Sequence, residues 1–299
     1  MVKTANLTPL MKQYWEIKTF HPDKILLFRM GDFFEMFYDD AEKAAPVMGI
    51  ALTSRNKNSE EKTPMCGVPH HSIGPHINKL LKAGLKVAIC DQLEDAALAK
   101  GLVRRGVTRI LSPGLVFDPD TLDESNPNLI ASFDEESVSF LEASTLEAFS
   151  YQVDASKRNE LIRALGPVEV ILSLDQELSG FENLVLSRCD LDLAAPRTEK
   201  FESQLRLKKY LGQMQANEHI LKIKFEVREL AGRMQLSTNT VKSLEIFENY
   251  QRETRGSLFQ AIDRTKSSAG KRCLKAWLRF PLLQRSAIEA RHDQVQVFS

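Results

Sequence analysis

The sequence predicts two α/β units followed by a helical segment. Its 299 residues are enough for about two domains. The composition, 43% apolar and 27% charged, is typical of a globular protein. Apolar runs of strand length alternate with helix-spaced patterns up to about residue 200, after which helix-spaced patterns dominate. These observations favour a small mixed-sheet α/β N-terminal domain, a second α/β unit and an all-helical C-terminal segment.

The same composition excludes several classes. No stretch of about 18 apolar residues is present, so no transmembrane helix is predicted. The N-terminus lacks an apolar core followed by a small-residue cleavage site, so no secretory signal is predicted. The four cysteines show no C-x-x-C spacing, which predicts reduced thiols in a cytoplasmic protein and neither a disulfide framework nor a metal site.

The first unit is predicted to start with a helix over residues 8–20, because Thr8-Pro9 provides a capping hydroxyl and a proline at the first helical position. The apolar run 25–30 predicts a buried strand. The aromatic run 33–38 predicts a second strand, and the turn pair Gly31-Asp32 joins the two as a hairpin.

The rest of the first unit alternates helices, loops and strands. Asp39 is predicted to cap a helix that ends at Gly49. Residues 54–63 form a polar loop without an apolar anchor, and residues 64–71, which contain two prolines, a stiffer loop. The remaining predicted elements are a helix over 72–83 and strands over 85–90 and 107–111.

The strands and helices of the second half are predicted from its turn-forming residues and apolar patterns. Residues 116–128 are rich in Asp, Pro and Asn and are expected to be a linker. Strands are predicted at 129–133, 137–143, 148–153 and 168–172, with a helix over 155–165. Helices are predicted at 201–216, 238–250, 257–262, 268–279 and 285–299. The sequence ends inside a helical pattern without a stop signal, so we expect the natural polypeptide to continue.

Charge is distributed unevenly along the chain. The formal net charge is zero, with 40 basic and 40 acidic residues. Residues 121–200 carry 6 basic and 16 acidic residues, whereas residues 201–299 carry 18 and 10. Phosphate contacts need Lys and Arg, so an acidic middle segment is not expected to lie on nucleic acid. A nucleic-acid contact would come from the first or the last segment.

The pair Phe33-x-Glu35 is the short motif with the clearest chemical meaning. Residues two apart on a strand face the same way, so a ring and a carboxylate would stand side by side. A protruding ring can stack on a base or wedge between base pairs, and a mispaired base is easier to unstack. Phosphates repel the carboxylate, which would discriminate by accepting a hydrogen bond from a base. The pattern recurs at Phe133-Asp134-Glu135, so alone it predicts core packing more often than DNA binding.

Longer blocks are more specific than this tripeptide. The run from Arg29 to Ala41, RMGDFFEMFYDDA, closely resembles the mismatch-recognition segment of the bacterial MutS family of DNA mismatch-repair proteins. Other blocks resemble the same family in the same order: Thr8-Pro9-Leu10-Met11, His21-Pro22, Leu52-Thr53-Ser54-Arg55, Pro64 to His71, Val87 to Asp95, Ser112-Pro113-Gly114, Leu244-Glu245-Ile246, Ser257-Leu258-Phe259 and Gly270 to Leu278. The resemblance is dense over residues 8–115 and weak over 120–235.

The resemblance implies a domain order. Residues 1–115 would form a mismatch-recognition domain, followed by the linker over 116–128. Residues 129–218 would form an RNase H-like connector domain, and residues 219–299 the start of a helical lever and core domain that is truncated here. Phe34 stands where the family commonly has Tyr, and Ala96-Ala97-Leu98 replaces a proline-containing stretch.

The resemblance also implies roles for individual residues. Phe33 would be the wedge that stacks at a mismatch, and Glu35 would hydrogen-bond the mispaired base. Met65, in the stiff loop, would approach the DNA near the wedge. Further DNA contacts are expected at basic residues of the polar loop and of a basic doublet before a strand, namely Arg55, Lys57, Lys62, Arg104 and Arg105.

Nucleotide binding is not expected in this chain, although the full-length family is a DNA-dependent ATPase that uses ATP and Mg. The P-loop pattern G-x-x-x-x-G-K-[S/T] is absent, and the nearest string has Thr265 for the first glycine and Arg272 for the Ser/Thr. The resemblance therefore implies no catalytic residues and no cofactor here. It implies mismatched double-stranded DNA, a homodimer in the full-length form and a MutL-like repair protein bound by the connector as partners.

Two alternatives remain open from the sequence. The chain could be a non-enzymatic interaction module whose acidic connector binds a repair protein, and which does not bind DNA by itself. A metal hydrolase built on His70 and His71 is the weaker alternative, because no helix places Cys66 and the nearby histidines on one face. A two-metal nuclease has no supporting acidic motif.

Overall fold

A computed structural model describes residues 8–55, 63–94, 101–115, 127–142, 145–181, 184–192, 198–214 and 222–297. The chain divides into two compact units, residues 1–116 with 211–217 and residues 117–210 with 218–299. The expected linker over 116–128 lies outside the described residues except at its last two positions. Among the helices of the described part, none has the length and apolar character needed to cross a membrane.

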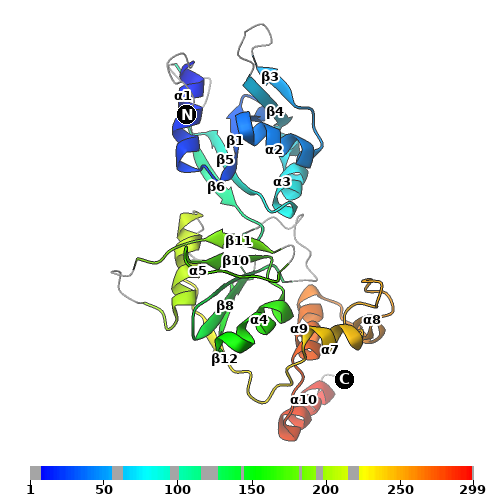
Figure 1. Ribbon diagram of the computed structural model, residues 1–299. Helices are drawn as coiled ribbons and strands as arrows, with labels where there is room; N and C mark the ends of the chain where they lie inside the picture. Colours follow the sequence, from blue (N-terminus) through cyan, green and yellow to red (C-terminus); the bar gives the residue numbers. More distant parts are fainter. Residues whose placement is uncertain are drawn as a thin grey trace. The chain divides into compact units, whose positions relative to one another are not determined.

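The first unit is built on a six-stranded mixed sheet with the strand order β3-β4-β2-β1-β5-β6 (Figure 1). Its strands are β1 (Lys24–Met30), β2 (Phe33–Phe37), β3 (Thr53–Arg55), β4 (Thr63–Pro69), β5 (Lys86–Gln92) and β6 (Arg105–Leu111). Its helices are α1 (Pro9–Phe20), α2 (Tyr38–Met48) and α3 (Ile73–Lys82), with the short 3-10 helix η2 (His70–Ser72). β1 and β5 are parallel, and the other neighbouring strands are antiparallel.

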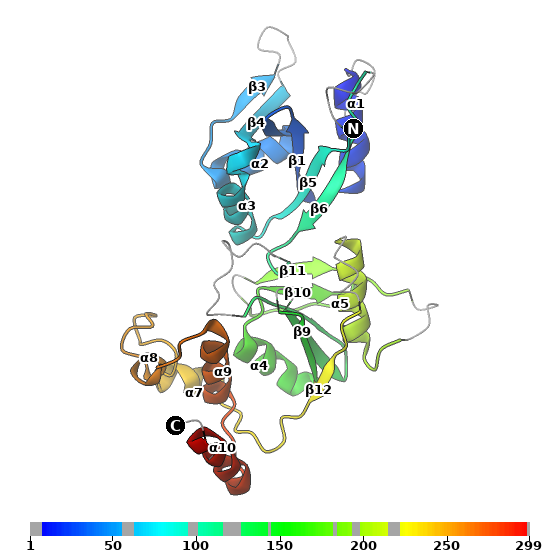
Figure 2. The same cartoon turned by 180° about the vertical axis from the view of Figure 1, so that it is seen from behind.

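Helices cover the two faces of this sheet unequally. On one face, the Tyr14 ring of α1 makes edge contacts with Phe28 and Phe37, at 5.6 and 5.1 Å between centroids. On the other face, the Cys66 thiol of β4 lies 3.7 Å from the carbonyl oxygen of Ala41 in α2. Figures 1 and 2 show α1 on one side of the sheet and α2 with α3 on the other. Of the helices that the structure describes in this unit, α1 covers one face of the sheet and α2 and α3 share the other (Figures 1 and 2).

The predicted start of the first unit is confirmed. The Thr8 hydroxyl accepts from the amide of Met11, and Pro9 opens α1. β1 and β2 pair as an antiparallel hairpin in which Met30 faces Phe33, leaving a two-residue turn. Gly31 in that turn has φ of +57°, a left-handed value that glycine adopts without strain. The turn thus sets which face of the sheet each β2 residue occupies.

Three predictions for the first unit are wrong, in whole or in part. The start of the predicted polar loop over 54–63 belongs to the strand β3, which pairs with β4. Asp39 does not cap α2: the helix starts at Tyr38, and its cap residue, Phe37, makes no side-chain cap bond. The predicted loop over 64–71 is instead β4 followed by η2. Its prolines, Pro64 and Pro69, lie near the two ends of β4, where a missing amide N–H disturbs the ladder least.

The second unit contains another six-stranded mixed sheet, with the order β11-β10-β7-β8-β9-β12. Its strands are β7 (Leu129–Phe133), β8 (Ser137–Glu142), β9 (Glu147–Gln152), β10 (Glu169–Leu172), β11 (Val185–Arg188) and β12 (Glu226–Arg228). β7, β8 and β9 form an antiparallel meander. β10 is parallel to both β7 and β11, and β12 is parallel to β9.

The two faces of this sheet differ in chemistry. Under α4 (Ala155–Leu165) lies an apolar core that includes Phe140, Phe149 and Leu161. Under α5 (Glu202–Gln213) lies a layer of hydroxyl groups, in which the Ser203 hydroxyl is 2.6 and 2.7 Å from those of Ser137 and Ser139. α5 is thus attached to the sheet through directed hydrogen bonds as well as through burial.

The structure confirms the strands predicted at 129–133, 137–143, 148–153 and 168–172 and the helices predicted over 155–165 and 201–216. Two short strands were not predicted. β11 and β12 have four and three residues and lie at the two edges of the sheet. β12 also interrupts the run of helices expected after residue 200 and lies beyond residue 218, where the connector was expected to end.

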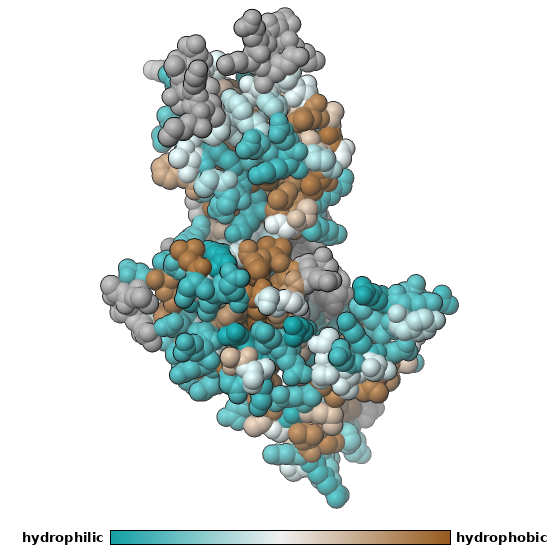
Figure 3. All heavy atoms as spheres, in the orientation of Figure 1, coloured by the Kyte–Doolittle hydropathy of each residue, from teal (hydrophilic) through white to brown (hydrophobic). Residues whose placement is uncertain are grey.

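The remaining helices are α7 (Thr238–Ser243), α8 (Leu258–Ile262), α9 (Ser268–Arg279) and α10 (Arg285–Val297). The helix predicted over 238–250 ends early, at Ser243. Phe280, directly after α9, packs into the apolar core under α4. On the face shown in Figure 3, hydrophobic surface forms separate patches among polar residues.

Candidate nucleic-acid interface

Phe33 is the first residue of β2 and lies directly after the hairpin turn. Its side chain is 45% exposed, whereas Phe34 is 5% exposed and Phe37 is fully buried. The amide of His70 donates to the carbonyl of Asp32 at 2.8 Å, so the segment after β4 holds the turn in place. A large aromatic ring is therefore presented to solvent from a supported strand end.

Glu35 lies two residues further on and projects from the same side of β2. It is half-buried and faces Gly67 of β4 across the ladder. A Cβ atom at position 67 would lie 3.3 Å from Cγ of Glu35 and 3.2 Å from the carbonyl oxygen of Phe34. The missing side chain of Gly67 thus leaves the room that the Glu35 side chain occupies.

Burial and a neighbouring charge act in opposite directions on this carboxyl. Burial raises the pKa of Glu35 above its ordinary value, and the charge of Arg55 partly opposes the rise. Nη1 of Arg55 lies 3.9 Å from Oε2 of Glu35. The Arg55 guanidinium also lies over the ring of Phe37, 5.7 Å from its centroid. Arg55 therefore borders the face that carries Phe33 and Glu35.

Met65 belongs to the same face. It pairs with Phe37 across the β2–β4 ladder, so the two side chains point the same way, and Met65 is half-buried. The structure thus brings together Phe33, Glu35, Arg55 and Met65. The sequence did not reveal the importance of Gly67, although its place within the predicted stiff loop was visible.

The other residues predicted to contact DNA differ in their positions. Arg104 has an exposed side chain, and its amide donates to Glu94. Arg105 is held inside the unit: its guanidinium donates to the carbonyls of Arg29 and Val103 at 2.6 and 2.9 Å, and lies over the ring of Phe28. Burial lowers the pKa of Arg105. These bonds give it a bracing position between strands. The other two, Lys57 and Lys62, lie outside the described residues.

The histidine and cysteine residues near this face show no metal-ligand arrangement. Across the part of the chain that the structure describes, no three His, Cys, Asp or Glu side chains are grouped so that they could hold an ion. The rings of His70 and His71 meet edge to face, 5.7 Å apart. Burial raises the pKa of the Cys66 thiol to about 11, which disfavours the thiolate that binds metals.

The residues nearest to a P-loop do not fit a nucleotide phosphate. The Ser267 hydroxyl caps α9 by accepting from the amide of Gly270 at 3.1 Å. A Cβ atom at Gly270 would contact Ser267 and Thr265 at 3.3 and 3.5 Å, so these side chains already fill the space beside it. This segment is a helix start capped by Ser267.

The two units can now be compared with known proteins. Residues 8–120 match the family model for MutS domain I, and residues 239–299 match the model for MutS domain III. The chain is therefore built from domains of a multidomain repair-protein class. It is 37% identical to a DNA mismatch repair protein MutS of Syntrophobacter fumaroxidans over 97% of its length, and 38% identical to one of Streptococcus thermophilus over 98%.

A protein with the same name from Caldicellulosiruptor bescii is 38% identical over 97% of the chain. The chain belongs to the MutS family. It spans 37% of the length of the Syntrophobacter relative and 36% of the other two. The family resemblance inferred from the sequence is thus confirmed.

Proposed function

We propose that this protein takes part in DNA mismatch repair, and that its first unit binds mismatched or looped-out base pairs in duplex DNA. The observation that carries the proposal is the exposed ring of Phe33, held at a strand end beside the half-buried Glu35. Stacking of a base on an aromatic ring is worth about 1–3 kcal/mol, and unstacking a base step costs a few kcal/mol. Phe33 would therefore enter most easily where pairing is already weak.

Glu35 would act as the discriminator at the same step. A carboxylate gains nothing from phosphates, so its place beside the wedge is explained by a hydrogen bond to the mispaired base. Burial raises the pKa of Glu35, which favours its protonated form relative to that of an exposed glutamic acid, and a protonated carboxyl can also donate a hydrogen bond. Arg55 and Met65 would contact the DNA beside this pair. Arg104, Lys57 and Lys62 are proposed as further DNA contacts. Arg105 would support the sheet that carries them.

The domain assignment is proposed on the same basis. The antiparallel meander β7-β8-β9, continued by the parallel strands β10 and β11, supports an RNase H-like connector that begins at residue 129. The connector would include β12 and extend past residue 218. The helices from α7 onward would form the start of the lever and core domain. ATPase activity, homodimer formation, binding of a MutL-like protein and a cytoplasmic location are proposed for the full-length form.

The test is binding of the whole chain to a G·T duplex and to a matched duplex of otherwise identical sequence. Phe33→Ala should reduce the preference for the G·T duplex by about 5- to 100-fold, the equivalent of one lost stacking contact. Phe20→Ala is the matched control, because Phe20 is an 82% exposed phenylalanine at the end of α1.

The control variant should bind as the wild type does. An unchanged G·T preference in Phe33→Ala would disprove the wedge. Glu35→Ala should shrink the preference while affinity for the matched duplex holds or rises, because a charge repelled by phosphates is lost. If the wild type binds neither duplex even at low salt, where phosphate contacts are strongest, the chain is an interaction module without a DNA grip.

A further inference from the structure

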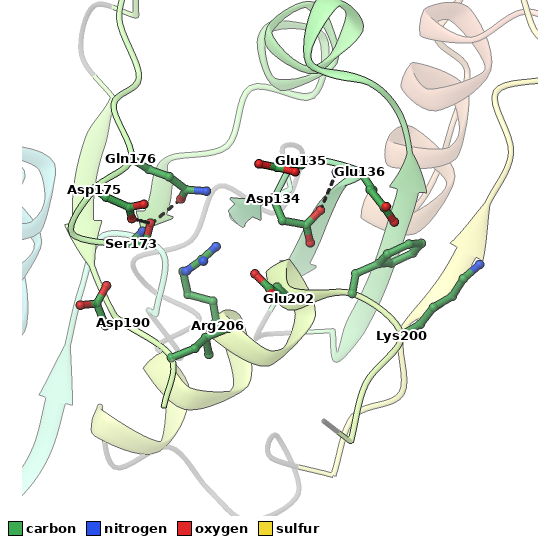
Figure 4. A pocket seen from close by; sticks show the side chains of 12 residues that line it. Asp134, Glu135, Glu136, Ser173, Asp175, Gln176, Asp190, Lys200, Glu202 and Arg206 are labelled. Carbon is green, nitrogen blue, oxygen red and sulfur yellow. Dashed lines mark hydrogen bonds between the residues drawn. The ribbon is translucent and has the colours of Figure 1, made fainter. Parts of the chain in front are cut away.

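A cavity of about 620 Å³ lies in the second unit, whereas Phe33 belongs to the first. Its lining residues follow the ends of three mutually parallel strands (Figure 4): Asp134 follows β7, Ser173 follows β10, and Asp190 follows β11. The start of α5 supplies the remaining wall. In open α/β sheets, ligands bind in the crevice outside the carboxyl ends of parallel strands. The cavity occupies that position.

The charges around this cavity are mostly negative. The lining contains two basic side chains, Lys200 and Arg206, and six acidic ones, Asp134, Glu135, Glu136, Asp175, Asp190 and Glu202. Three of the carboxylates are fixed by the fold: Asp134 accepts from the amide of Ser203 at 2.8 Å, Asp175 from the Ser173 hydroxyl at 2.5 Å, and Asp190 from the amide of Leu174 at 2.8 Å. A negative potential is thus built into a rigid wall.

Arg206 is one of the two basic residues of the lining, and it is only 4% exposed. It extends from α5 into the region between Asp134 and Ser173 (Figure 4). Within the described residues, its side chain donates two hydrogen bonds, both from Nη1: to the hydroxyl of Ser132 at 3.3 Å and to the carbonyl of Phe133 at 2.8 Å. Nε is buried and has no partner among the described residues. A buried N–H donor without a hydrogen-bond partner costs free energy, so an acceptor supplied by a ligand would stabilise Arg206.

These two features select the chemistry of the ligand. The described residues hold no group of three metal-ligating side chains, so the cavity has no such set for a metal ion. A polyphosphate or nucleic acid would offer acceptors to Arg206 but would be repelled by six carboxylates. A polyamine would match the carboxylates but has no acceptor. A basic peptide has both cationic side chains and carbonyl oxygens.

We infer that this cavity binds a lysine- or arginine-rich peptide segment of a partner protein. The cationic side chains pair with the rim, above all with Glu135 and Glu136, which are exposed in the turn between β7 and β8. A backbone carbonyl of the peptide accepts from the guanidinium of Arg206, which lines the cavity. Because the site uses none of the residues proposed to touch DNA, the inference stands or fails separately from mismatch binding.

The test uses an N-acetylated, C-amidated tetralysine peptide, titrated calorimetrically into the whole chain at about 0.15 M salt, where weak surface attraction is screened. The double variant Glu135→Gln/Glu136→Gln should weaken binding about fivefold or more, as expected for two lost ion pairs. The matched control is Glu160→Gln/Glu248→Gln, which removes two exposed carboxylates outside the cavity. Equal binding by the two double variants would overturn the inference.

Spermine separates the role of Arg206 from charge alone, because it carries four positive charges like tetralysine but no carbonyl. The wild type should bind tetralysine more tightly than spermine. Arg206→Lys keeps a positive charge and removes the guanidinium edge, so it should reduce that preference, with the melting temperature as the check on folding. Equal affinity of the wild type for both ligands would overturn the contribution of Arg206. The G·T preference of the Glu135→Gln/Glu136→Gln variant should stay unchanged.

Discussion

The tripeptide Phe-x-Glu occurs at Phe33 in the first unit and at Phe133 and Phe140 in the second. The copies at Phe33 and Phe133 have opposite environments. Phe33 is 45% exposed at the first position of β2, whereas Phe133 is 2% exposed at the last position of β7. The Phe133 ring lies in the apolar core under α4, with the Arg158 guanidinium 4.1 Å from its centroid. The carboxylates differ as well, because Glu35 is half-buried on a strand and Glu135 is exposed in a turn.

The difference arises from what covers each face, and the tripeptide itself does not encode it. In the first unit, Tyr14 of α1 covers the Phe37 end of β2. Phe33 lies four residues away, about 13 Å along the strand, beyond that contact. In the second unit, α4 packs over the end of β7. A short motif therefore acquires a binding role only where the surrounding fold leaves it uncovered.

Among the variants that compare the two units, Phe133→Ala should lower the unfolding free energy most. Removing a fully packed ring leaves a cavity, and such substitutions cost about 3–5 kcal/mol of unfolding free energy. Chemical denaturation of the whole chain, followed by a signal from the second unit, measures the loss. The preference for a G·T duplex should persist under conditions in which the variant is folded. A loss below about 1 kcal/mol would contradict the core position of Phe133.

Much of the fold could be predicted from the sequence, because capping and turn residues give strong local signals at the ends of helices and strands. Thr8-Pro9, the turn Gly31-Asp32 and Gly49 marked true element boundaries. β11 and β12 were missed because strands of three or four residues carry too few positions for a period, and they form through pairing with distant neighbours.

The candidate site was predicted in part for a related reason. Family resemblance pointed to Phe33 and Glu35, and the hairpin prediction put both on one side of a strand. The position of Gly67 opposite Glu35 follows from the register of β4. The prolines of β4 led to the prediction of a loop, so this register could not be predicted. The inward direction of Arg105 depends on contacts with Arg29 and Val103 that no local pattern encodes.

Gly67→Ala should have the next largest effect. The added methyl group would press on Cγ of Glu35 at 3.3 Å and on the Phe34 carbonyl oxygen at 3.2 Å, so strand or side chain must shift. Overpacking of this kind costs about 1–3 kcal/mol. Gly74→Ala is the control, because a Cβ atom there has no neighbour within 4 Å and the site lies in α3. Thermal unfolding should show a lower melting temperature for Gly67→Ala than for the wild type. The melting temperature of Gly74→Ala should not fall.

Phe33→Ala should change stability little, which is the counterpart of the Phe133 result. The ring is already hydrated over much of its surface, so the unfolding free energy should fall by less than about 1 kcal/mol. Denaturant titration under the conditions used for Phe133→Ala gives the comparison. A loss as large as that of Phe133→Ala would mean that the ring supports the fold, and would remove the basis for a wedge role.

The smallest expected effect concerns the titration of Glu35. Burial raises its folded-state pKa, so the folded chain keeps the proton at pH values where the unfolded chain has released it. This contribution to stability is fully present below the unfolded pKa and is lost as pH rises through the raised folded pKa. Arg55 lowers that pKa, so Arg55→Gln should raise it further and move the loss to higher pH. An NMR titration of the Glu35 carboxyl carbon measures the change, with Arg104→Gln as the control for a lost surface charge. A pKa that stays constant or falls in Arg55→Gln would show that the 3.9 Å approach of the two side chains carries no interaction in solution.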